Sequence, residues 1–167
     1  HDASNSFINN VTGNLTIKNS ADDSDIIFQS DNGSGGVMDY FRLDGSDVRI
    51  NINARMQFMD DVKASFGTSG DLKIYHDSND SRIENSTGDI VIQQETDDRD
   101  IKFRCDDGSG GTTDYFVVDG GLVANIFYKR IKLVDNVQLQ VGSNPDLLIY
   151  HDTSNSYIQA DGTGDLI

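Results

Sequence analysis

The sequence repeats itself with a period of 75 residues. The run Leu72-Lys73-Ile74-Tyr75-His76-Asp77 returns as Leu147-Leu148-Ile149-Tyr150-His151-Asp152, and the three histidines of the chain stand at positions 1, 76 and 151. When residues 1–75 are laid on residues 76–150 without a gap, about two-fifths of the positions are identical. Self-similarity at a fixed period is the signature of a repeat architecture. We therefore divide the chain into repeat unit 1 (1–75), repeat unit 2 (76–150) and the start of repeat unit 3 (151–167), and we expect an excerpt of a longer repetitive protein.

Each repeat unit carries the pattern of short strands joined by turns. Apolar residues alternate with polar ones at Leu15/Ile17 and Ile90/Ile92, which predicts half-buried strands. The next strands are expected around Ile26/Phe28 and Asp39–Phe41, and at the equivalent places of the second unit. Between them lie Asp31–Gly36 and Asp106–Gly111, and an Asn-Gly or Asp-Gly pair between apolar strands is a strong hairpin signal. The fold class predicted is all-β.

One stretch is ambiguous between helix and strand. Met56, Met59, Val62 and Phe66 have spacings that fit an amphipathic helix. The equivalent stretch of the second unit, 131–141, alternates at Val137, Leu139 and Val141 instead. Because two copies of one unit should share a fold, we predict a strand in both.

Composition limits what a single chain can bury. Hydrophobic residues make up 36% of the chain, there is no Trp, and the net charge is −15. Stacking or oligomerisation would help a chain this poor in bulky side chains to form a core. The negative charge argues against nucleic acid as a partner, because counterion release needs a basic face, and against anionic membrane surfaces. No apolar run approaches the length of a membrane span.

Three segments resemble a known family of virion proteins. Residues 71–77, 106–120 and 146–158 are similar to repeats of tail fibres and related appendages of marine cyanobacterial phages, in which runs close to DLxIYHDGSNSYI, TGDLxIQ and DDGSGGTTxYFxxDG recur. Thr153 stands where glycine is usual, and Asp80 and Arg82 depart from the pattern. The resemblance implies an elongated repeat of short strands and hairpins, an intertwined trimeric β-helix or β-prism fibre shaft. It implies virion partners and a distal tip that contacts the host receptor.

The Tyr-His-Asp triplets do not predict catalysis. Consecutive residues of a strand point to opposite faces, so His76 and Asp77 are poorly placed to act as a base and its orienting group. No nucleophile recurs at a fixed distance from them. We expect the chain not to be an enzyme.

The residue types allow two kinds of metal site. Six aspartates precede strands in two equivalent clusters and could offer oxygen ligands to Ca²⁺, although no EF-hand or nonapeptide motif is present. They are Asp22, Asp23, Asp25, Asp97, Asp98 and Asp100. In a trimer, His76 and His151 could each meet copies of themselves on the threefold axis and bind a transition metal. Solvated acidic turns and packed histidines are the plainer alternatives.

The sequence thus favours a structural function. We expect a stiff spacer in a phage tail fibre or similar appendage, located on the virion or otherwise outside the cell, with copies of itself as the main partner. A single-chain β-solenoid of a secreted adhesin would explain the same repeats as a monomer. A carbohydrate-binding module would need exposed aromatic side chains, for which the candidates are Tyr40, Phe41, Tyr115, Phe116 and Tyr157.

Overall fold

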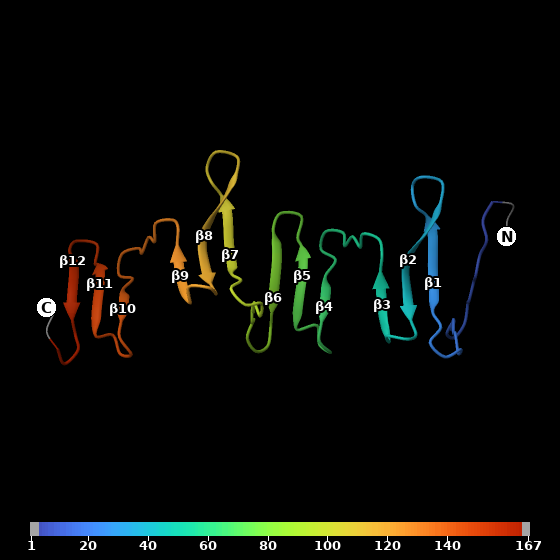
Figure 1. Ribbon diagram of the computed structural model, residues 1–167, viewed down its shortest axis with the longest axis horizontal. Coiled ribbons are helices and arrows are strands. Elements are labelled where there is room, and N and C mark those ends of the chain that lie inside the picture. Colours follow the sequence, from blue (N-terminus) through green and yellow to red (C-terminus); the bar gives the residue numbers. More distant parts are fainter. Residues whose placement is uncertain (1–3, 165–167) are drawn as a thin grey trace. The chain divides into compact units, whose positions relative to one another are not determined.

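The computed structural model describes residues 4–164, and this part of the chain consists of β-strands and connections without a helix (Figure 1). The prediction of an all-β fold is confirmed. The strands are β1 (Ile26–Asp31), β2 (Val37–Asp44), β3 (Arg49–Ile52), β4 (Ala64–Phe66), β5 (Leu72–His76), β6 (Ser81–Asn85), β7 (Ile101–Asp106), β8 (Thr112–Asp119), β9 (Ala124–Phe127), β10 (Leu139–Val141), β11 (Leu147–His151) and β12 (Ser156–Ala160). His1 lies outside the described residues.

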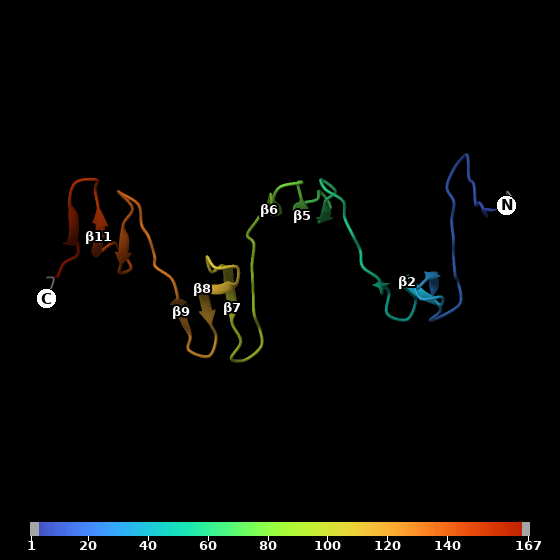
Figure 2. The same ribbon diagram turned by 90° about the horizontal axis from the view of Figure 1, so that it is seen from above.

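The strands form four antiparallel sheets of three strands each, in the orders β1-β2-β3, β4-β5-β6, β7-β8-β9 and β10-β11-β12. The first two belong to one compact unit, His1–Asp89, and the last two belong to another, Ile90–Ile167. Within each unit, every strand contact among the described residues joins strands of the same sheet. Each sheet is therefore a single layer, as the view in Figure 2 shows for β4-β5-β6 and for β7-β8-β9.

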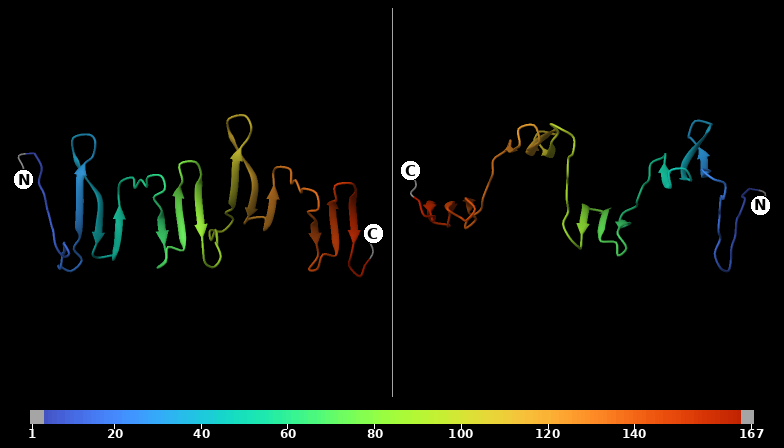
Figure 3. Two further views of the ribbon diagram at one scale, coloured as in Figure 1. Left: turned by 180° about the vertical axis from the view of Figure 1, so that it is seen from behind. Right: turned by 60° about the horizontal axis from the view of Figure 1, so that its bottom comes forward.

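Every strand of the first unit has a counterpart exactly one repeat later in the second. β1 and β7 begin at Ile26 and Ile101, and β6 and β12 begin at Ser81 and Ser156, so both pairs are offset by the sequence period. The two equivalent sets of strands can be followed in Figure 3. The repeat boundary drawn between residues 75 and 76 falls inside β5. A periodic sequence can be divided at any phase, and the two compact units of the structure divide the chain between residues 89 and 90.

A β-bulge interrupts the first hairpin of each unit at the same place. The register of β1 on β2 shifts between Phe28 and Gln29, and that of β7 on β8 shifts between Phe103 and Arg104. The extra residue on the opposing strand is Tyr40 or Tyr115. Each tyrosine hydroxyl donates a 2.9 Å hydrogen bond to the last carbonyl of the first strand, at Asp31 or Asp106. The bulge thus directs a tyrosine to the base of the loop that follows.

That loop is organised by one side chain in each unit. The Asn32 carboxamide oxygen accepts hydrogen bonds from the amides of Ser34 and Gly36 and from the Ser34 hydroxyl, at 2.9 to 3.1 Å. An Asp107 carboxylate oxygen accepts the equivalent three bonds at 2.7 to 3.1 Å. Hydrogen bonds from nearby backbone amides to an Asn or Asp side-chain oxygen are typical of Asx turns. The hydroxyl and amides of the loop lower the pKa of Asp107 below its ordinary value.

The turn that ends β2 and β8 rests against the turn that precedes β1 and β7. A Cβ atom built on Gly45 would lie 2.5 Å from the carbonyl oxygen of Ser24, and one on Gly120 would lie closer still to that of Arg99. The same contact is closed by a hydrogen bond from each glycine amide to Asp25 or Asp100, at 3.0 and 3.2 Å. Only glycine allows the two backbones to approach in this way.

The strands predicted at 15–17 and 90–92 were wrong, and those predicted in 54–66 and 131–141 are shorter than expected. Residues 15–17 and 90–92 alternate as predicted, but the structure assigns them no strand, because a strand needs a hydrogen-bonded neighbour and the described chain offers none here. The predicted strands of 54–66 and 131–141 are confirmed only at their ends, as β4 and β10. Val62 and Val137 instead close tight turns, each donating its amide to a carbonyl three residues earlier.

We predict that Gly120→Ala destabilises the sheet β7-β8-β9, because the added methyl group must displace a backbone carbonyl. Overpacking of this kind costs about 1–3 kcal/mol. Gly121→Ala is the matched control, since a Cβ there meets only side-chain atoms at 3.6 Å or more. Urea unfolding followed by circular dichroism measures both variants. Equal midpoints for the two alanine variants would contradict the packing described here.

Candidate functional site

The sheets β1-β2-β3 and β7-β8-β9 each have one face made of apolar side chains. Directly paired residues of antiparallel strands share a face, and so do residues two apart along a strand. In the first sheet this apolar face consists of Ile26, Phe28, Phe41, Leu43, Ile50 and Ile52. In the second sheet it consists of Ile101, Phe103, Phe116, Val118, Asn125 and Phe127. Stacked rings confirm the assignment, with centroids 4.4 Å apart for Phe28–Phe41 and 5.5 Å apart for Phe103–Phe116.

The sheets β4-β5-β6 and β10-β11-β12 are built in the same way. The pairings place Ala64, Phe66, Leu72, Ile74, His76, Ser81, Ile83 and Asn85 on the apolar face of the first. The apolar face of the second holds Leu139, Val141, Leu147, Ile149, His151, Ser156, Ile158 and Ala160. None of the four apolar faces carries Asp, Glu, Lys or Arg, although the chain as a whole is 25% charged.

The charged side chains of the strands lie on the opposite faces. Arg104 and Asp114 form an ion pair at 2.5 Å where they are paired across β7 and β8. Lys73, Glu84 and Arg82 share the second face of β4-β5-β6. Each sheet is thus amphipathic, with a binary pattern that turns apolar side chains to one side.

The apolar faces are not covered within the described chain. Phe103 is 46% exposed and Phe127 is 53% exposed, and the only buried apolar residues among those described, Val117 and Leu148, lie on the opposite faces of their sheets. A contiguous apolar surface that stays exposed marks a place where another surface binds.

His76 and His151 stand at the end of the apolar faces to which they belong. Each pairs across its hairpin with a serine, and Nδ1 lies 3.3 Å from the Ser81 hydroxyl or 3.1 Å from the Ser156 hydroxyl. Both histidines are exposed. They are 75 residues apart and belong to different sheets, and neither is part of a metal-binding group of three or more His, Cys, Asp or Glu side chains within residues 4–164. A histidine metal site would need other copies of the chain.

The histidine and the aspartate of each Tyr-His-Asp triplet have separate partners. The Asp77 carboxylate accepts a 2.8 Å hydrogen bond from the backbone amide of Asp80 and forms an ion pair with Arg82. His76 instead contacts Ser81. These bonds lower the pKa of Asp77 to about 2, with the Asp80 amide as the largest cause. Asp152 caps the equivalent turn through the amide of Asn155 at 2.7 Å and the Tyr157 hydroxyl at 2.8 Å, and its pKa is lowered as well.

The two aspartate clusters do not assemble a ligand set. Within residues 4–164 no group of three or more His, Cys, Asp or Glu side chains is arranged to hold a metal ion. The third member of each cluster is used inside the fold: Asp25 pairs with Arg42 at 3.2 Å, and Asp100 pairs with Lys102 at 3.3 Å. Asp23 and Asp98 have positive φ and form the turn itself.

The aromatic candidates for carbohydrate binding have different surroundings. Phe41 and Phe116 belong to the apolar faces, where they stack on other phenylalanines. Tyr40 and Tyr115 are hydrogen-bonded to their loops, and the Lys129 ammonium lies 5.9 Å from the centre of the Tyr115 ring. Tyr157 stacks on Tyr150 with centroids 4.7 Å apart. Within each unit, no ring contact among the described residues joins one of these candidates to another.

Sequence reasoning missed a polar network on the second face of β1-β2-β3. The buried Asp44 carboxylate accepts hydrogen bonds from the Ser46 hydroxyl and the Asn51 carboxamide, both at 2.8 Å, and it pairs with Arg42 at 3.1 Å. The Ser46 hydroxyl is the largest cause of its lowered pKa. The second repeat has Val117 and Ile126 where the first has Arg42 and Asn51. This exchange of a polar pair for an apolar pair between the repeats is visible in the sequence, and it could have indicated that the two side chains are in contact.

The described residues include no helix with the length and apolar content needed to cross a membrane. Comparisons with known proteins add no family: no protein-family model, curated protein or solved structure matches this chain. Its function is therefore inferred from its own residues.

We predict that the Asp77 carboxyl group titrates near pH 2 in an NMR experiment on the folded chain. Because this pKa lies below the value of about 3.9 in an unfolded chain, the ionised group stabilises the hairpin at higher pH, and that contribution is lost between about pH 4 and pH 2. Arg82→Gln should raise the pKa but leave it below the ordinary value, since the Asp80 amide remains. Titration of the unsubstituted chain near 3.9 would contradict the capping role.

Proposed function

We propose that this chain is a structural shaft segment of a phage tail fibre or similar virion appendage, in which copies of the chain cover one another's apolar faces. One observation carries the proposal. The same pair of amphipathic sheets recurs every 75 residues, and each sheet leaves its apolar face exposed in the single chain. A repeated unit of this kind gains stability by stacking with its neighbours or with other chains.

A parallel homotrimer suits these sheets. Three copies around one axis can turn all their apolar faces inward, which a single layer of three strands cannot do alone. Wrapping around each other also protects the edge strands from uncontrolled pairing. The charged faces then point outward, where a net charge of −15 per chain keeps the assembly soluble. The shaft acts as a stiff spacer between other virion proteins and a distal tip that binds the host receptor.

Light scattering after size exclusion tests the proposal. We predict a mass near three times 18.3 kDa. A chelator such as EDTA should leave the mass unchanged, because the apolar faces rather than the aspartate clusters hold the copies together. A mass of one chain at micromolar concentration would contradict the proposal and favour a single-chain solenoid. Loss of the trimer only in EDTA would show that the aspartates bind an ion.

Two neighbouring aromatic residues provide a matched pair of variants. Phe127 is 53% exposed on the apolar face, whereas Tyr128, which is 57% exposed, follows the end of β9 and is not among the paired residues of that face. We predict that Phe127→Asp gives monomers, because three carboxylates would be brought together out of water, whereas Tyr128→Asp stays assembled. Circular dichroism shows whether each variant keeps its strands. Equal masses for two folded variants would place the interface elsewhere.

A further inference from the structure

The repeat creates a problem of register for any assembly of identical chains. If copies pack through their apolar faces, a chain shifted by 75 residues would lay the face of β1-β2-β3 on the face of β7-β8-β9. These two faces are nearly the same. Ile26, Phe28 and Phe41 have identical counterparts at Ile101, Phe103 and Phe116. Leu43 and Ile52 are replaced by Val118 and Phe127, which are also apolar. The shared hydrophobic chemistry therefore tolerates the shifted register.

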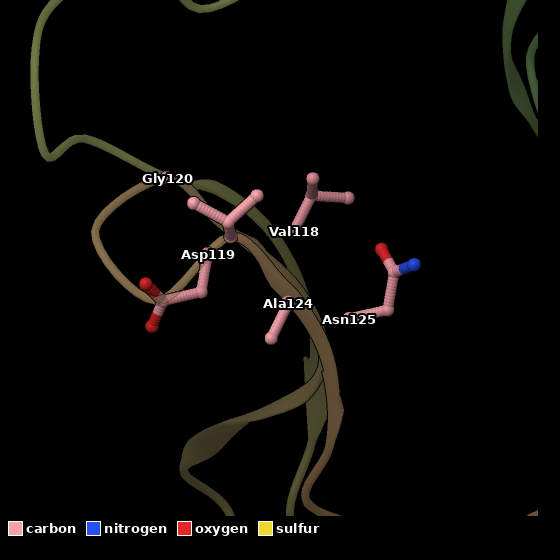
Figure 4. Close-up of a pocket in the computed structure, with 6 residues that line it drawn as sticks. Val118, Asp119, Gly120, Ala124 and Asn125 are labelled. Atoms are coloured by element: carbon pink, nitrogen blue, oxygen red, sulfur yellow. The ribbon is translucent and has the colours of Figure 1, made fainter.

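Among the six positions named above for each of these faces, one differs in polarity. Asn125 on β9 occupies the place of Ile50 on β3, and it is paired with Val118 as Ile50 is paired with Leu43. Figure 4 shows Val118 and Asn125 on one side of the ribbon and Asp119 and Ala124 on the other. The residues border a hollow of about 320 Å³. Asn125 is thus a polar side chain on the apolar side of its sheet.

The Asn125 carboxamide has no hydrogen-bond partner within residues 4–164. A second asparagine on an apolar face behaves differently. Asn85 on β6 donates to the carbonyls of Thr87 and Gly88, at 2.7 and 2.9 Å, and is satisfied by its own chain. Asn125 would therefore enter an interface with the hydrogen bonds of its carboxamide unmade.

We propose that Asn125 selects the register of the assembly by pairing with the Asn125 side chains of other copies of this chain. This inference rests on the proposed self-assembly and names the residue that aligns it. In register, carboxamides meet carboxamides, each of which offers both donors and an acceptor. Shifted by one repeat, Asn125 meets Ile50, and its amide is buried without a partner, which is costly. A single buried asparagine fixes register in coiled coils by the same physical effect.

Cross-linking at the single cysteine measures the register. Cys105 is exposed, and it lies on β7 two residues beyond Phe103 and past the bulge, as Ser30 lies on β1 two residues beyond Phe28. In the experiment, the unsubstituted chain and a Ser30→Cys/Cys105→Ser chain are mixed in denaturant. The mixture is then refolded and treated with a short bis-maleimide. Mass spectrometry of the peptides distinguishes the links. Links between two positions 105 or two positions 30 report the aligned register, and links between positions 30 and 105 report the shifted one.

The substitutions are made in both chains of the mixture. Asn125→Ile makes the two faces equally apolar, and Ile50→Asn makes them equally polar. Although the two changes have opposite effects on hydrophobicity, each removes the difference between repeats. We expect both to raise the share of 30-to-105 links by about tenfold over the mixture with neither change. The exchange variant Ile50→Asn/Asn125→Ile should return the share to the original level.

Two results would overturn the inference. If the assembled variants give the same share of 30-to-105 links as the original mixture, Asn125 does not select the register, although the proposed self-assembly stands. If light scattering shows that the unsubstituted chain is a monomer, the proposed function and the role of Asn125 fail together. The mass measurement therefore separates the two failures.

Discussion

The contact on which the rest of this structure depends is the stacking of apolar side chains across one face of a three-stranded sheet. Phe28 lies on Phe41, and Phe116 lies between Phe103 and Phe127, with ring centroids 4.4 to 5.5 Å apart. These contacts order three strands but cannot remove their outer surface from water. A sheet that has only one layer needs a second layer for its apolar face. In the described part of each unit that layer is not supplied by the chain itself.

Comparison of the two repeats shows which side chains vary on each face of the sheets. On the charged face, the network of Arg42, Asp44 and Asn51 in the first repeat gives way to Val117 and Ile126 around Asp119 in the second. The apolar face is much more uniform, and five of the six positions in β1-β2-β3 and β7-β8-β9 stay apolar. The charged face can stabilise its sheet by polar or apolar contacts. The apolar face keeps the property that a common interface would need.

Much of this fold follows from the sequence because its signals are local. The residues that form turns and the alternation of apolar and polar side chains were enough to predict the hairpins around Asn32-Gly33 and Asp107-Gly108. The same signals mark the strand at Leu72–His76. The strand predicted at residues 15–17 was wrong, because a strand also needs a neighbouring strand to form hydrogen bonds with. The alternation of apolar and polar residues does not show whether such a neighbour exists. The face to which Tyr40 or Tyr115 points also could not be predicted, since a bulge of one residue changes the phase of alternation. Asn125 became informative only once the strand register placed it among phenylalanines.

The central claim is that the apolar faces are buried between copies of the chain. Hydroxyl-radical footprinting of the chain in solution tests it most directly, with Tyr128, just beyond the end of β9, as the internal reference. Phe127 and Tyr128 have similar exposure in the single chain, 53% and 57%. The account predicts that Phe103 and Phe127 are strongly protected relative to Tyr128. Oxidation of Phe127 in proportion to its exposure in the single chain would contradict it.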